Sequence, residues 1–356
     1  MSTKHDLPRL SRQEIDQWPV ATAGFCARVV HGMEREGVAT VGELRQWPDE
    51  RLLRMRNFGA ITLKNVRWFY QWTRRLESGE YHLASYRVFL REFLDRSQVY
   101  VLEHRYELHN RLYRPWMRSC TLQQIARMMG GLTRERVRQV ESTGLAALRT
   151  QLCRAVGASI ASPLARRMDE TGGVVDAEGL RNWVGNPLLG KYQPWGVMVL
   201  ISDTMESIHY RSGCFYTFPA KTLQRLEKCI LPRLQQSADP VPFDQLREVA
   251  AGELGELPGR EAKVVRALLD HHPLVSATRD GRYFLPSAGG GGLIAEVMKR
   301  KAGPLHFHEV TRLYNEQVVP RNQVGPGSVL RLLNLAPAVE KVERSVYRHR
   351  HAAGAA

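Results

Sequence analysis

The sequence has few cysteines and no long apolar run. Its five cysteines are scattered, and none belongs to a C-x-x-C pair. This spacing argues against a disulfide framework or a zinc site and predicts reduced thiols. No apolar stretch could span a membrane, no lipidation motif is present, and the first residues, MSTKHDLPRLSRQEI, contain no apolar signal core. We therefore expect a cytoplasmic protein with no membrane partner.

Motifs that carry catalysis are also lacking. There is no HExxH motif, nucleophile elbow or paired-carboxylate cluster. His306 and His308 flank Phe307, but further metal ligands are absent, and we interpret both as surface polar residues. The run SAGGGG at residues 287–292 is not followed by Gly-Lys-Ser/Thr, so we interpret it as a flexible linker rather than a nucleotide cradle. The sequence predicts a protein that is not an enzyme and uses no cofactor or metal.

Acidic residues are outnumbered by basic ones. The chain has 51 Lys plus Arg against 36 Asp plus Glu, a net charge of +15 and a pI near 9.9. Arginine dominates, and its planar guanidinium suits phosphate and guanine, so we expect a nucleic-acid partner. With 356 residues, the chain is long enough for two to five compact modules.

Residues 121–148, TLQQIARMMGGLTRERVRQVESTGLAAL, predict two helices joined by a tight turn. A capping-box pattern begins at Thr121, ahead of apolar residues with helical spacing. Gly130 and Gly131 provide the permissive backbone of a sharp corner, and Thr133 can cap the second helix. We therefore expect a helix-turn-helix.

The second of these helices has an apolar side and a polar side. Val137, Val140, Leu145 and Leu148 follow helical spacing and should face a core. In a helix-turn-helix the start of this helix enters the major groove, where Arg can bond guanine, Gln adenine, and Glu the amino group of cytosine. A solvated charged face is the alternative. The candidate DNA-binding residues are Thr133, Arg134, Glu135, Arg136, Arg138 and Gln139.

These motifs resemble a known family. TRERVRQVE, with TLQQIA twelve residues ahead of it, and the upstream LDRSQVYVLEHRY are similar to region 4 of primary bacterial sigma factors, over roughly Leu90 to Leu152. The resemblance implies that this module reads the promoter element around −35 and docks on the flap of the RNA polymerase β subunit. Two departures concern the angle between the helices: the double-glycine turn is one residue longer, and the connection from Glu107 to Cys120 is longer too.

The N-terminal part predicts a helix-hairpin-helix. A helix is expected around Phe25 to Met33 and a short one near Val41 to Leu44, followed by RLLRMRNFGAITLKNVRWFY with a tight turn at Asn57-Phe58-Gly59. Glycine in such a hairpin lets backbone N–H groups approach a phosphate, and Thr62 can cap the helix or contact the phosphate.

This segment, through GVATVGELRQWPDERLLRMRNFG, resembles the C-terminal domain of the RNA polymerase α subunit over most of Trp18 to Phe69. In that family an arginine, a glycine and a serine are among the residues that bind an AT-rich minor groove. The resemblance places Arg28, Gly59 and Thr62 at these three positions. However, His31 replaces the family's asparagine and Ile61 its lysine. Minor-groove binding and a purely protein-docking role therefore both stay open.

A repeat follows Cys153. Val265, Leu268, Leu269, Pro273 and Val275 recur 64 residues later, which indicates duplication. Each copy ends in a hairpin pattern, SATRDGRYFLP or KVERSVYRHR, and a weaker copy runs from Ser159 to Pro219. Helices followed by a β-hairpin predict three winged helices, which contact either DNA or protein. The arginines at their wings that could reach a phosphate are Arg211, Arg279, Arg282 and Arg344.

The predicted fold class is mainly α and multi-domain, with a helix-hairpin-helix, a helix-turn-helix and about three winged-helix repeats carrying small β-hairpins. The predicted modules are residues 12–78 (α-subunit-like), 79–155 (sigma-like), and 156–219, 220–287 and 291–350 (winged-helix-like).

The two resemblances together predict a DNA-binding, sigma-like regulator of transcription initiation. Its expected partners are double-stranded promoter DNA and core RNA polymerase. We expect it in the bacterial cytoplasm, associated with the nucleoid, whether a bacterium or a phage encodes it. No segment resembles the sigma domain that melts the −10 element. One alternative is a polymerase-binding protein that inhibits or redirects the enzyme without sequence-specific DNA binding. Another is a DNA-architecture or repair protein using the helix-hairpin-helix.

Overall fold

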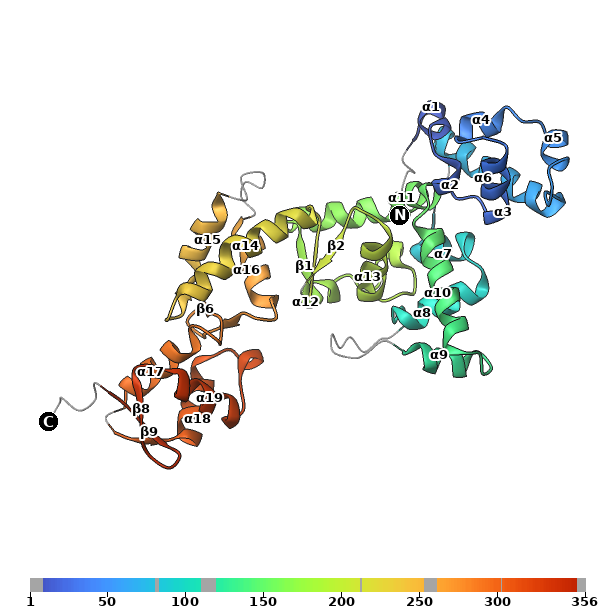
Figure 1. The fold of residues 1–356 in the computed structure, drawn as a ribbon. Coiled ribbons are helices and arrows are strands. Elements are labelled where there is room, and N and C mark those ends of the chain that lie inside the picture. Colours follow the sequence, from blue (N-terminus) through green and yellow to red (C-terminus); the bar gives the residue numbers. More distant parts are fainter. Residues whose placement is uncertain are drawn as a thin grey trace. The chain divides into compact units, whose positions relative to one another are not determined.

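The computed structural model describes residues 9–80, 83–109, 120–211, 213–252, 261–301 and 303–350. The predicted long connection between Glu107 and Cys120 falls mostly outside them. The described residues are mainly α-helical, with small three-stranded antiparallel sheets, which confirms the predicted fold class (Figure 1). The chain divides into two compact units: unit 1 is Met1–Glu170 with Ala177–Tyr210, and unit 2 is Thr171–Asp176 with Arg211–Ala356.

Unit 1 begins with six helices, and two of them, α1 and α4, start with a capping box. Ser11 and Thr40 each form a capping box with a glutamate three residues later. Asn57 has a φ of 65° and turns the chain between the last two helices, at the predicted position. The helices are α1 (Arg12–Asp16), α2 (Val20–Ala23), α3 (Ala27–Arg35), α4 (Val41–Arg45), α5 (Asp49–Leu53) and α6 (Ala60–Ser78).

Five further helices of unit 1 include the predicted helix-turn-helix. Asp95 caps the second of them with a capping box to Gln98. These helices are α7 (Tyr86–Phe93), α8 (Arg96–Arg105), α9 (Leu122–Met128), α10 (Arg134–Leu148) and α11 (Gln151–Glu170). Three short elements complete the unit: α12 (Ala177–Arg181), the 3-10 helix η1 (Pro187–Leu189) and α13 (Pro194–Thr204).

Helix α13 is packed against the end of α8. The Gln193 amide donates to the carbonyl of Leu108 at 2.8 Å, and Tyr106 Oη donates to Asp203 Oδ2 at 2.7 Å. A Cβ on Gly196 would lie 2.1 Å from the Tyr106 carbonyl oxygen, so only glycine permits this approach. Helix α13 is therefore buried along most of its length.

The three sheets are built from short strands. In unit 2, β1 (Val174–Asp176) pairs antiparallel with β3 (Cys214–Tyr216), with Val174 opposite Tyr216. The preceding strand, β2 (His209–Arg211), leads into this unit. The next elements are α14 (Ala220–Gln236), β4 (Val241–Pro242), α15 (Phe243–Ala251), α16 (Glu261–His271), β5 (Ser276–Ala277) and β6 (Arg282–Phe284). The last are α17 (Gly290–Lys299), β7 (Leu305–His306), α18 (Phe307–Gln317), the 3-10 helix η2 (Pro320–Asn322), α19 (Pro326–Leu335), β8 (Val339–Glu343) and β9 (Val346–His349).

The same order of elements occurs three times: a helix, a strand, two helices and a hairpin. This is the order of a winged helix. The second and third sheets have matching strand orders, β4-β6-β5 and β7-β9-β8. Except for Pro273 and Pro337, which are exposed, the duplicated apolar positions are buried in both copies, for example Leu269 and Leu333. The 64-residue offset therefore reflects two cores built in the same way.

The predicted glycine linker is wrong. Gly290, Gly291 and Gly292 form the first turn of α17. A Cβ on Gly292 would lie 2.1 Å from the carbonyl oxygen of Ala238, which means that the helix packs directly on the backbone of another segment. The glycines thus serve close packing, which the sequence alone did not distinguish from flexibility.

Candidate nucleic-acid interface

The turn between α9 and α10 has the predicted local geometry. Thr121 forms a capping box at the start of α9. Gly130 and Gly131 both have a φ of 81°, the left-handed conformation that favours glycine. Thr133 then caps α10, where its Oγ1 accepts a hydrogen bond from the Arg136 amide at 3.1 Å. One helix therefore ends, the backbone turns, and the next helix starts at the expected residues.

Helix α10 has a buried side and an exposed side. Val137 and Val140 are 0% and 8% exposed and pack in a cluster with Ile125 of α9 and Val101 of α8. Leu148 is buried as expected, whereas Leu145 is only half-buried. The six candidate residues are all exposed: Thr133, Arg134, Glu135, Arg136, Arg138 and Gln139.

Glu135 organises the exposed side of α10. It accepts two hydrogen bonds from Arg138, from Nε at 2.8 Å and from Nη2 at 2.7 Å, and one from Gln139 Nε2 at 3.4 Å. The hydrogen bond from Arg138 lowers the pKa of Glu135 and raises the pKa of Arg138. Arg136 Nη1 donates to Gln139 Oε1 at 3.3 Å. The polar side chains are therefore linked to one another at the start of the helix.

In the helix-hairpin-helix, two of the three residues predicted to contact DNA lie at the surface. Arg28 is exposed on α3, and Gly59 is the N-cap of α6 with open space around it. Gly59 has a φ of −105°, so backbone conformation does not require glycine there. Thr62 is instead only 3% exposed and is not the cap of α6. Its predicted phosphate contact does not fit this burial, because its side chain is buried in the first turn of the helix.

Residues near the hairpin that the sequence reasoning missed lie on α6. Lys64 is exposed in the second turn of α6, and Asn65 Oδ1 accepts from the Cys26 amide at 3.1 Å, tying the start of α3 to α6. The sequence signal for Lys64 is that it is the lysine nearest to Ile61, the position where the family has a lysine. At that position Ile61 is 82% exposed.

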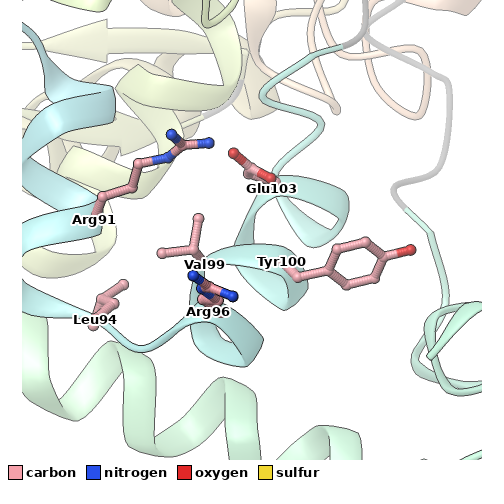
Figure 2. A pocket seen from close by; sticks show the side chains of 6 residues that line it. All are labelled: Arg91, Leu94, Arg96, Val99, Tyr100 and Glu103. Carbon is pink, nitrogen blue, oxygen red and sulfur yellow. The ribbon is translucent and has the colours of Figure 1, made fainter.

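A cavity of about 390 Å³ lies beside α7 and α8 (Figure 2). Its arginines are exposed, whereas Leu94 and Val99 are largely buried. Glu103 Oε1 accepts from Tyr192 Oη at 2.7 Å and lies 3.2 Å from His109 Nε2. In Figure 2 the side chains of Arg91 and Glu103 point toward each other. The lining residues are Arg91, Leu94, Arg96, Val99, Tyr100 and Glu103.

The arginines at the proposed wings are mostly held by the protein. Arg211 pairs with Glu227, Arg282 pairs with Asp280 and Glu296, and Arg279 donates to the backbone. Arg344 is exposed at the last hairpin.

Neither metal sites nor disulfides were found among the described residues. No three His, Cys, Asp or Glu side chains there are grouped to hold a metal ion, and none of the five cysteines is in a disulfide. Of the helices described, none combines the length and apolarity needed to cross a membrane.

Two segments of the sequence match known protein families. Residues 9–68 match the family described as the C terminal domain of the bacterial RNA polymerase alpha chain, and residues 94–150 match sigma-70, region 4. Both resemblances inferred from the sequence are thereby confirmed. No curated protein matches the sequence significantly. The protein therefore joins a C-terminal domain of the α-subunit type and a sigma-70 region 4, two modules that indicate a DNA-binding function in polymerase-associated transcription.

Proposed function

We propose that the protein is a sigma-like regulator of transcription initiation that reads a −35-type promoter element with α10. The observation that carries this proposal is the distribution of side chains on that helix. Arginine, glutamate and glutamine are exposed at its N-terminal end, while Val137 and Val140 anchor the opposite side in the core. These are side-chain types that discriminate bases in the major groove.

The hydrogen bonds within the polar set support base reading. Glu135 accepts two hydrogen bonds from Arg138, and these restrict the orientation of the guanidinium group before DNA is bound. A restricted side chain loses less conformational freedom when it pairs with guanine. The same carboxylate can accept a hydrogen bond from cytosine N4 of a neighbouring pair. Arg28 and Gly59 would contribute phosphate or minor-groove contacts from the other module.

For the polymerase contact we propose the cavity beside α7 and α8 as the docking surface for the flap of the β subunit. The cavity is concave and combines apolar lining at Leu94 and Val99 with exposed Arg91 and Arg96. Concave surfaces with apolar lining and a few charged groups are typical of binding sites. The family matches support a place in the bacterial cytoplasm. We further propose that the protein acts at the nucleoid and leaves DNA opening to other components.

A second candidate function is polymerase binding without sequence preference, to inhibit or redirect the enzyme. Two observations favour it. His31, which stands where the α-subunit family has asparagine, has its Nδ1 hydrogen-bonded to Glu34 Oε2 at 3.0 Å. Ile61 replaces the family's lysine with an exposed apolar side chain. Both substitutions weaken minor-groove binding and suit a protein surface.

Selection of bound duplexes from a random pool, with and without core polymerase, tests the first proposal. We expect a preferred sequence, and we expect Arg138→Ala and Glu135→Ala to change the preference at defined base pairs. Each good base contact is worth about 1–3 kcal/mol of discrimination. Ala146→Ser, on an exposed position nearer the end of α10, is the matched control and should leave the preference unchanged.

The two candidate functions predict different outcomes. If all duplexes bind equally, and if the double variant of Arg134 and Arg138 to alanine still pulls down polymerase, the second function holds. Loss of the pull-down with Arg91→Ala and Arg96→Ala would support the proposed docking cavity. Retention of the pull-down would place the polymerase contact elsewhere.

A further inference from the structure

We infer that the hairpins of the first two winged-helix repeats are docking surfaces for the next repeat of the same chain, and not wings that bind nucleic acid. The second hairpin is a joint with two apolar faces. One face packs on the helices of its own repeat, and the other packs on the helices that follow.

The second hairpin shows the arrangement most directly. Successive side chains of a strand point to opposite faces. Tyr283 of β6 belongs to the core formed with α14 and α16, where Val265 is a member. Phe284, the next residue, belongs to the following core with Leu293 and Ile294 of α17. Both aromatic rings are almost completely buried. Strand β6 therefore contributes one aromatic side chain to each of two consecutive cores.

The first hairpin also packs on the helices of the next repeat. Cys214 and Tyr216 of β3 are both 0% exposed and belong to the core that contains Leu226 of α14 and Val265 of α16. The sheet formed by β1 and β3 thus covers the helices of the repeat that follows it in the sequence.

Ion pairs accompany both joints. Arg211 donates from Nε to Glu227 Oε1 of α14 at 2.7 Å, and Glu227 is only 9% exposed. Arg282 donates from Nη1 to Glu296 Oε2 of α17 at 3.1 Å. In each case an arginine of the hairpin pairs with a glutamate on the first helix of the next repeat. An arginine neutralised in this way has little charge left to offer a phosphate.

Hydrogen bonds to backbone carbonyl groups close the second joint. The amide of Arg279 donates to the carbonyl of Gln317 at 2.7 Å, and Arg279 Nε donates to the carbonyl of Val318 at 3.2 Å. In return, the amide of Val319 donates to the carbonyl of Ala277 at 3.1 Å. The tip of this hairpin is therefore bound to the end of α18. In a wing that contacts nucleic acid, the tip would be exposed to solvent instead.

The third hairpin is built differently. At the 64-residue offset, Tyr347 occupies the place of Tyr283 and is 3% exposed in its own core. The place of Phe284 is taken by Arg348, which is exposed and paired with Glu340. A polar outer face is what the terminal unit of a repeat array requires. Phe284 therefore marks a hairpin that joins two repeats, whereas Arg348 marks the polar outer face of a cap.

Hydrogen exchange and duplex binding by the full-length protein test this inference. Phe284→Ala should speed amide exchange in α17 and α18 by about tenfold or more, because it removes the shared ring from the following core. Arg282→Ala should give a smaller increase in the same helices. Arg348→Ala, at the matched position of the cap, should leave exchange unchanged. None of the three variants should alter affinity for duplex DNA or its salt dependence.

Two results would overturn the inference. One is unchanged exchange in α17 and α18 after Phe284→Ala. The other is weaker duplex binding by Arg282→Ala, with a smaller salt dependence and unchanged exchange, which would make the hairpin a nucleic-acid wing. If the alanine variant of Phe284 does not fold, Phe284→Leu takes its place, with faster exchange in the same helices as the expected result.

Discussion

At the scale of single residues, Glu227 is a buried carboxylate within unit 2. Glu227 is 9% exposed, accepts hydrogen bonds from Arg211, and has His272 Nε2 at 4.0 Å. Burial lowers the pKa of His272, and Arg211 lowers it further, while Glu227 acts in the opposite direction. His272 is therefore held neutral, and its Nδ1 accepts from the Leu274 amide at 3.2 Å.

This environment predicts a pH dependence of stability. A histidine whose folded pKa lies below its unfolded value of about 6.5 binds protons more readily when unfolded, so stability falls as pH decreases below that value. We expect the melting temperature of the transition that includes unit 2 to decrease from pH 7 to pH 5, as measured by calorimetry. His272→Asn keeps a side-chain acceptor for the Leu274 amide without titrating, so it should reduce this decrease. An equal decrease in both proteins would contradict the assignment.

At the scale of elements, α17 shows how a glycine-rich sequence can form a packed helix. Glycine is a poor helix former because its backbone loses much freedom on folding. Here neighbouring segments leave no room for a side chain, and this packing requirement outweighs the low helix propensity of glycine. A Cβ on Gly290 would lie 3.2 Å from Leu332, and one on Gly292 would lie 2.5 Å from Asp239 Oδ1 as well as against the Ala238 backbone.

Alanine substitution distinguishes packing from flexibility. Gly292→Ala should destabilise the protein by roughly 1–3 kcal/mol or more, because the added methyl group overlaps backbone atoms. Gly327→Ala, also in a helix but with open space around it, should be neutral or stabilising by up to about 1 kcal/mol. Urea unfolding measures both. Similar small effects at the two positions would restore the linker interpretation.

At the scale of the whole molecule, the net charge of +15 makes DNA binding dependent on salt. Not every arginine contributes, since many pair with carboxylates. Among the candidate residues, Arg134 and Arg136 are exposed beside the start of α10, where phosphates of the duplex would pass.

We therefore expect Arg134→Ala and Arg136→Ala to lower the slope of log affinity against log salt concentration, by about 1 for each phosphate interaction removed. Fluorescence anisotropy between about 50 and 200 mM salt is the measurement. Arg331→Ala, an exposed position on α19, provides the control and should leave the slope unchanged. If the control lowers the slope as much as the α10 variants do, charge alone governs binding.

Much of the organisation could be predicted from the sequence because it depends on neighbouring residues. The cap at Thr121, the glycine corner and the cap at Thr133 occur where the pattern predicted them, since hydrogen bonds and backbone conformation at these sites are local. The two family resemblances and the fold class are confirmed for the same reason: short motifs and periodicity survive in a single sequence. The bounds of the five modules and the DNA contacts stay predictions.

The tertiary structure decided what depends on residues far apart in the sequence. The burial of Thr62, the packing of Gly292 and the pairing of Arg211 with Glu227 each involve a neighbour that no local pattern specifies. A charged or small side chain has the same appearance in a sequence whether it faces solvent or another segment. Only the fold brings Phe284 into the core of the next repeat while leaving Arg348 in solvent, and burial beside a particular partner determines the role of each.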